Sequence, residues 1–129
     1  MHHPFLRTAA LTGALSVLLG AFGAHWLKQQ LSTDNMQVFE TGVRYQFYHV
    51  FALLAVAMLY KDYGGAKLKW SGYCFIAGII LFSGSLYALS YLRQQNPDMK
   101  WIGAITPIGG VAFIAGWILL GLSVRKKRD

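Results

Sequence analysis

A few ionisable side chains stand inside long apolar stretches of this 129-residue chain, where charge is costly and invites a functional explanation. Glu40 and Arg44 are four residues apart, so on a helix they share one face, where they can form an ion pair or bind a ligand. His49 lies about 15 Å along the same helix from Phe39, near mid-membrane. Because imidazole titrates near neutral pH, His25 and His49 are candidate proton carriers, with a hydrogen-bonded packing role as the alternative.

Other polar residues fall at a similar depth in the expected helices. Thr106 and Pro107 precede two glycines, and the missing proline N–H predicts a kink or a short unwound turn there. If these groups converge, they would form a binding site or vestibule in one half of the membrane. The candidate ligand- or ion-binding residues are His25, Glu40, Arg44, Tyr45, Gln46, His49, Ser85, Tyr87, Thr106 and Pro107.

The sequence lacks the residue patterns that catalysis or cofactor binding needs. It has no pair of acids, no serine beside a base, and no carboxylate or thiol at a ligand spacing from the two histidines, whereas structural zinc takes four ligands. Its single cysteine, Cys74, is interpreted as a packing residue. We therefore predict no catalytic residue, no metal site and no cofactor.

The elements that must position these residues are four apolar segments. Residues 8–27, 70–92 and 101–124 contain no Asp, Glu, Lys or Arg, and each is long enough to cross about 30 Å of hydrocarbon. Only 13% of the whole chain is charged, while 55% is hydrophobic. The prediction is an all-α integral membrane four-helix bundle, a single domain over 1–129 with helices at about 6–27, 39–60, 70–92 and 101–124.

The net charge of +7 follows membrane topology rather than nucleic-acid binding, because the basic residues lie in loops and at the tail instead of on one helix face. Four Lys and Arg residues are expected on one side, and eight on the side that holds both termini: Arg7, Lys61, Lys67, Lys69, Arg125, Lys126, Lys127 and Arg128. The positive-inside rule then places both termini in the cytoplasm. A cleaved secretory signal at residues 7–24 is the alternative for the first helix.

Short loops and small residues predict how the helices pack. Short loops force antiparallel neighbours, so the chain should form two antiparallel helical hairpins. Within lipid, close helix contact depends on small side chains spaced four apart, and these are frequent in the segments. The predicted packing residues are Ser16, Gly20, Ala24, Gly84, Ala88, Gly109, Ala112 and Gly116.

Several segments resemble one known family in the same order and spacing. They are LGAFGAHWL at residues 19–27, YQFYH at 45–49, LFSGSLYAL at 81–89 and TPIGGVAFIAGW at 106–117. The chain is thereby identified as a member of the YgdD/YwdK-type family of small membrane proteins, the domain of unknown function 423 group, to which transmembrane protein 256 is similar. The resemblance implies four transmembrane helices, a retained first helix and, for a bacterial member, the inner membrane. It implies no activity.

The sequence is compatible with three hypotheses about function. The leading hypothesis is a non-enzymatic structural or accessory bundle that binds a membrane protein partner or lipid, in a multi-pass inner-membrane setting, with a homo-oligomer as one form of partner. The alternative is an oligomeric transporter or channel subunit with a polar outer vestibule for a proton, an ion or a small anionic solute. An intramembrane enzyme ranks third because no arrangement of residues meets its geometric demands.

Overall fold

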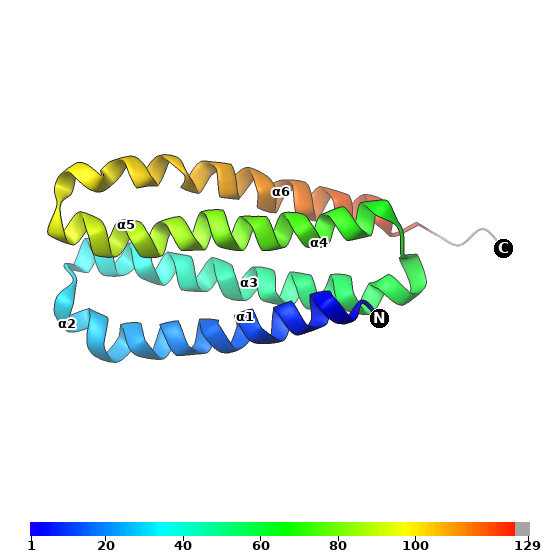
Figure 1. Cartoon of the computed structure of the whole chain (residues 1–129), viewed down its shortest axis with the longest axis horizontal. Coiled ribbons are helices and arrows are strands. Elements are labelled where there is room, and N and C mark those ends of the chain that lie inside the picture. Colours follow the sequence, from blue (N-terminus) through cyan, green and yellow to red (C-terminus); the bar gives the residue numbers. More distant parts are fainter. Residues whose placement is uncertain (126–129) are drawn as a thin grey trace.

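A computed structural model describes residues 1–125 of the chain. The predicted basic residues Lys126, Lys127 and Arg128 lie outside the described residues. Four helical spans are long and apolar enough to cross a membrane: His3–Gln30, Thr33–Tyr63, Ala66–Gln95 and Pro97–Ser123. They run alternately up and down as two hairpins (Figure 1), so the predicted all-α membrane bundle of two antiparallel hairpins is confirmed.

The first span is α1 (His3–Phe22), a π-helical turn η1 (Gly23–Leu27) and the short α2 (Lys28–Gln30), and the second is the single helix α3 (Thr33–Tyr63). The third span consists of α4 (Ala66–Gly78), a π-helical turn η2 (Ile79–Ser83) and α5 (Gly84–Gln95). The fourth is a 3-10 helix, η3 (Pro97–Ala104), followed by α6 (Thr106–Ser123). Three of the four spans therefore change helix type along their length.

The ends of these helices follow from local side-chain and backbone chemistry. Ser32 Oγ accepts a hydrogen bond from Asn35 N at 3.2 Å, and this N-cap starts α3 at Thr33 instead of at residue 39. Gly65 separates α3 from α4 with a φ of 137°, a conformation that other residues adopt at a steric cost. The chain therefore reverses direction within two glycines.

The interruption expected near Pro107 lies just before that residue. The 3-10 helix η3 ends at Ala104, and the carbonyl of Ile105 accepts from both Ile108 N and Gly109 N, at 3.1 and 3.2 Å. Pro107 stands in the first turn of α6, where its missing N–H has no intrahelical partner to lose. The change from 3-10 to α-helix thus occurs without a break inside α6.

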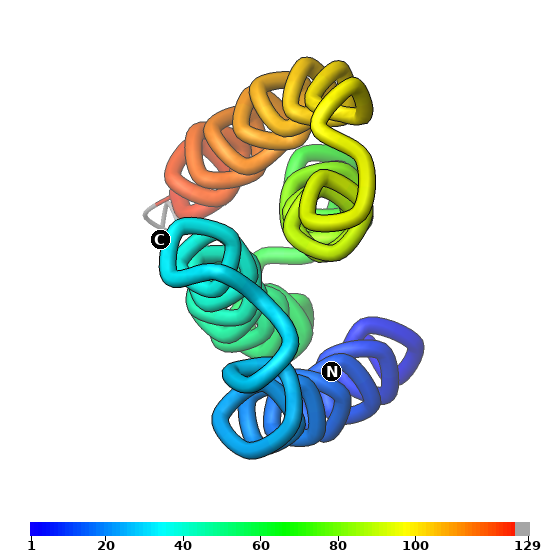
Figure 2. Tube along the Cα trace, turned by 90° about the vertical axis from the view of Figure 1, so that its left-hand side faces the viewer, coloured from blue at the N-terminus to red at the C-terminus, as the bar shows by residue number. Residues whose placement is uncertain are grey.

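Seen along the bundle, the spans form a staggered row, with α1 and α6 on the outside and α3 and α4–α5 between them (Figure 2). Half of the most apolar stretch of α3 and 44% of that of α4–α5 are buried, against 17% in each outer span. Both the first residue and the end of α6 lie at one end (Figure 1), here named the terminal end, and the α2 turn lies at the opposite, hairpin end.

Candidate functional site

Gln46 links three helices in the interior of the bundle. Its side chain is 1% exposed, and its Nε2 donates to the carbonyl oxygen of Thr12 in α1 at 3.0 Å. Its Oε1 accepts from the hydroxyl of Tyr87 in α5 at 2.6 Å. The amide therefore uses a donor and an acceptor toward opposite neighbours, which stabilises the position of α3 between α1 and α5.

Buried serines make similar links between neighbouring helices. Ser83 Oγ donates to the carbonyl of Gly42 at 2.7 Å, and Ser71 Oγ donates to that of Gly116, also at 2.7 Å. Ser85 Oγ lies 2.6 Å from Thr106 Oγ1, so the start of α6 is bonded to α5. Such hydroxyl bonds fix helices to one another where lipid offers no competing partner.

His49 is a packed, doubly bonded histidine. Its Nδ1 lies 2.7 Å from the carbonyl oxygen of Tyr45, and its Nε2 lies 3.1 Å from Trp117 Nε1. Indole N–H only donates, so Nε2 must be the acceptor and Nδ1 the protonated nitrogen of a neutral ring. The ring also stacks on Phe113, with centroids 3.5 Å apart. Both ring nitrogens of His49 therefore have hydrogen-bond partners within the bundle.

The predicted site residues accordingly fall into two groups. Gln46, His49 and Ser85 are buried, and Tyr87 and Thr106 are partly buried beside them. Within residues 1–125, each buried side-chain nitrogen or oxygen atom has a hydrogen-bond partner. The more exposed group is His25, Glu40, Arg44, Tyr45 and Pro107. The predicted residues thus divide into a hydrogen-bonded interior set and an exposed set that includes the charged Glu40 and Arg44.

A groove between the first span and α3 holds the charged pair. One cavity of about 170 Å³ is lined by Gly20, Ala24, Met36, Phe39, Glu40, Val43 and Arg44. A second cavity, of about 320 Å³, is lined by Lys28, Leu31, Thr33, Met36, Gln37 and Glu40. Because Met36 and Glu40 line both cavities, the two adjoin, and together they are named the α1–α3 groove. His25 lines neither cavity.

The small residues predicted to pack lie in different surroundings. A Cβ at Gly109 would collide with the backbone of Phe82, and a Cβ at Gly116 would come within 2.7 Å of Phe75. A Cβ at Gly20 would make an ordinary 3.7 Å contact with Val43, whereas Gly84 has open space around it. Ser16 is fully buried, Ala112 and Ala88 are partly buried, and Ala24 is exposed in the α1–α3 groove.

A polar cluster at the hairpin end escaped sequence reasoning. Arg93 donates from Nε and Nη2 to Asn35 Oδ1, at 2.8 and 2.5 Å. Gln94 Oε1 accepts from Asn35 Nδ2 at 2.7 Å and from Ser32 N at 3.0 Å. These bonds tie the start of α3 to the end of α5. In a sequence, polar residues at a helix end look like residues exposed to solvent. This cluster is recognisable only once the start of α3 and the end of α5 are known to lie together.

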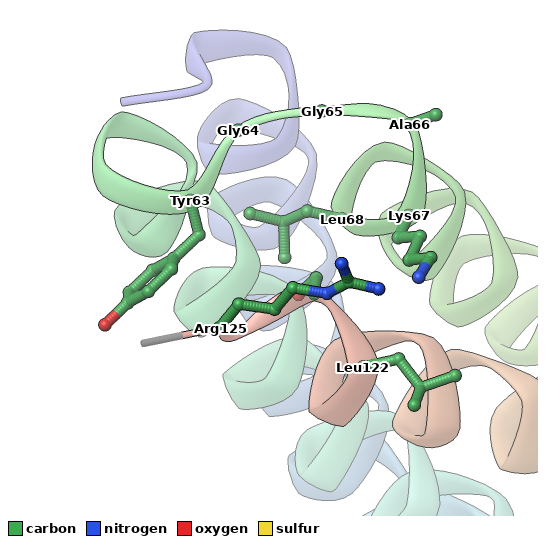
Figure 3. A pocket seen from close by; sticks show the side chains of 9 residues that line it. Tyr63, Gly64, Gly65, Ala66, Lys67, Leu68, Leu122 and Arg125 are labelled. Atoms are coloured by element: carbon green, nitrogen blue, oxygen red, sulfur yellow. The ribbon is translucent and has the colours of Figure 1, made fainter. Parts of the chain in front are cut away.

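A basic pocket lies at the terminal end. Its volume is about 250 Å³, and it is lined by Tyr63, Gly64, Gly65, Ala66, Lys67, Leu68, Leu122, Ser123 and Arg125. Figure 3 shows Arg125 extending from the end of α6 toward the side of the pocket that carries Lys67. Two cations and no acid line it among the described residues, in contrast to the mixed charges of the α1–α3 groove.

The sequence of this chain is similar to those of known membrane proteins. The model of a family described as "Protein of unknown function (DUF423)" matches residues 19–110. The chain is 42% identical to the UPF0382 membrane protein YwdK of Bacillus subtilis over 95% of this chain and 96% of that protein. It is 41% identical to the UPF0382 inner membrane protein YgdD of Escherichia coli, over 93% and 88% respectively. No solved structure matches it.

Proposed function

This chain belongs to the DUF423 family of proteins of unknown function, and we propose that it is a non-enzymatic accessory bundle that binds a lipid or a membrane protein at its surface. The observation that supports this proposal is that the interior polar groups are hydrogen-bonded within the bundle. Gln46 and Ser83 bond to neighbouring helices, and His49 bonds to Trp117 in α6 through Nε2 and to Tyr45 in its own helix through Nδ1. Groups held in this way stabilise a bundle and leave binding to the exposed residues of the grooves.

The orientation is part of the proposal. Eight of the 12 Lys and Arg residues fall on the side of the two termini, which favours a cytoplasmic terminal end in a bacterial inner membrane. The α1–α3 groove, at the hairpin end, would then face the outer half of the bilayer. The basic pocket with Lys67 and Arg125 would face the anionic inner surface.

A transporter or channel subunit is the weaker proposal. A conducting path would need polar groups that face water, whereas Gln46 and Tyr87 bond to each other and His49 bonds to Trp117. Proteoliposome flux separates the two proposals. We expect no proton or small-anion flux above that of empty vesicles, and flux that disappears on His49→Phe would favour the transporter.

The accessory proposal is tested by gentle extraction of the full chain. Native mass spectrometry after release into lipid nanodiscs or mild detergent should show the protein with a retained lipid or with a second protein at defined stoichiometry. A bare monomer in every detergent and nanodisc tried would contradict the proposal.

A further inference from the structure

The α1–α3 groove joins an apolar furrow to a row of alternating charges. Along its wall, Gly20 and Ala24 leave room, while Met36, Phe39 and Val43 supply apolar surface. Phe39 and Met36 also pack closely against Gly23, since a Cβ at Gly23 would lie 2.7 Å from the Phe39 ring. A furrow with these apolar walls suits part of an acyl chain.

The charges at the groove alternate in sign. Lys28 and Glu40 line one cavity, and Glu40 and Arg44 line the adjoining one, so the acid stands between two bases. Glu40 and Arg44 are about 6 Å apart along the axis of α3, and both are exposed. Glu40 lies about 10 Å from the start of α3, a depth that places it near the headgroups at the membrane surface.

Charge complementarity selects the ligand. A purely anionic headgroup would meet Glu40 with repulsion, whereas a zwitterionic headgroup places its ammonium against Glu40 and its phosphate against Arg44. Arginine suits phosphate because its guanidinium donates two parallel hydrogen bonds. The basic pocket at the terminal end has no such acid among its described residues, so the two ends of the bundle differ in the headgroup they would accept.

The π-helical turn η1 adds an independent observation, since Ala24 belongs to this turn and also lines the groove. Single π-turns inside α-helices occur frequently at functional sites. From these features we propose that the α1–α3 groove binds a zwitterionic phospholipid, with Glu40 on the ammonium, Arg44 on the phosphate and an acyl chain along Gly20 and Ala24. This inference rests on the proposed accessory function and names the ligand class of that site.

The experiment is lipid competition on the full chain. Delipidated protein is offered equal amounts of phosphatidylethanolamine, phosphatidylcholine and phosphatidylglycerol, and the adducts are counted by native mass spectrometry. We expect zwitterionic adducts to dominate. Arg44→Gln should lower their retention about tenfold, the loss that one charged hydrogen bond implies. Glu40→Gln should remove the preference for zwitterionic over anionic lipid.

Steric and charge controls separate the groove from the rest of the surface. Ala24→Leu fills the furrow without changing charge and should lower retention, whereas Ala14→Leu, exposed elsewhere on the first span, should not. Asp98→Asn removes an exposed acid outside the groove and should leave the lipid preference unchanged. The substituted residues are exposed, and an unchanged thermal midpoint shows that each variant folds.

The outcomes distinguish two failures. If lipid is retained but Ala24→Leu, Glu40→Gln and Arg44→Gln behave like their controls, the groove assignment is wrong and the accessory function stands. A second copy of the chain in place of lipid would also overturn the groove assignment. If neither lipid nor protein is retained by the unsubstituted chain, both proposals fail together. Should a variant fail to fold, protection of Ala24→Cys from a lipid-soluble maleimide by added phosphatidylethanolamine, in a Cys74→Ser background, decides the matter.

Discussion

Gln46 joins three helices because a primary amide offers a donor and an acceptor pointing in opposite directions. Gln46→Leu removes both bonds and leaves the Tyr87 hydroxyl without its acceptor. We expect the free energy of unfolding to fall by about 1–2 kcal/mol, because two interhelical bonds of about 0.6 kcal/mol each are lost and one buried hydroxyl loses its acceptor. Equilibrium unfolding in mixed detergent micelles measures it.

A double-mutant cycle isolates the Gln46–Tyr87 bond itself. Tyr87→Phe removes only the hydroxyl, so the losses of Gln46→Leu and Tyr87→Phe should combine to less than their sum. Additive losses would contradict a direct bond between the two side chains. Gln95→Leu, exposed at the end of α5, serves as the control for the amide substitution.

His2 gives the terminal end a dependence on pH. Its Nδ1 accepts from Phe5 N at 3.2 Å and caps α1. Burial lowers the pKa of His2 below its ordinary value of 6.5, and the positive charge of Lys69 lowers it further. The unfolded chain therefore binds more protons between the lowered pKa and 6.5, so stability rises with pH across that window and is lost on acidification.

The measurement for His2 is the thermal midpoint in detergent at pH 5 and pH 7.5, relative to variants. His2→Asn keeps a capping acceptor but does not titrate, so it should reduce the loss at low pH. His3→Asn replaces the exposed neighbour and should leave the loss as it is. Equal pH profiles for the unsubstituted chain and His2→Asn would refute the assignment.

At the scale of elements, Gly109 sets how closely α6 approaches the third span. Because a Cβ there would collide with the Phe82 backbone, Gly109→Ala must push the two helices apart. We expect a loss of roughly 1–3 kcal/mol in the free energy of unfolding. Gly121→Ala in the same helix meets open space and should change stability by less than about 0.5 kcal/mol. Equal effects would show that helix propensity, not contact, decides the result.

The four spans could be predicted from the sequence because lipid imposes length and apolarity on every spanning segment. α3 begins six residues before residue 39, because its first turns, in which four of residues 33–38 are polar, depend on the Ser32 cap. The π-turns η1 and η2 carry no sequence signal comparable to that of Pro107.

The sequence draws attention to the interior residues of the candidate site because polar groups stand out in an apolar run. The sequence does not identify the hydrogen-bond partners of these residues. Periodicity shows which face of a helix a residue lies on, but not which neighbouring helix that face contacts. Thus Gln46 and His49 were singled out, whereas Thr12 and Ser71 were not, since a threonine carbonyl and a lone serine look ordinary in a sequence.

At the scale of the whole molecule, the charge distribution predicts orientation. In a Cys74→Ser background, Gln95→Cys at the hairpin end should react with a membrane-impermeant maleimide in intact bacterial cells. Lys67→Cys at the terminal end should react only after the membrane is opened, because the basic side stays in the cytoplasm. The reverse pattern of labelling would place the termini outside.

The central position of α3 affects the order in which its hydrogen bonds can form during synthesis. This span is the least apolar of the four and carries Glu40, Arg44, Gln46 and His49 into the membrane. Two of its described partners outside α3, His2 N and Thr12 O, are synthesised before it, whereas Tyr87, Ser83 and Trp117 emerge later. The second span to leave the ribosome therefore completes its interhelical hydrogen bonds only after the second hairpin has been synthesised.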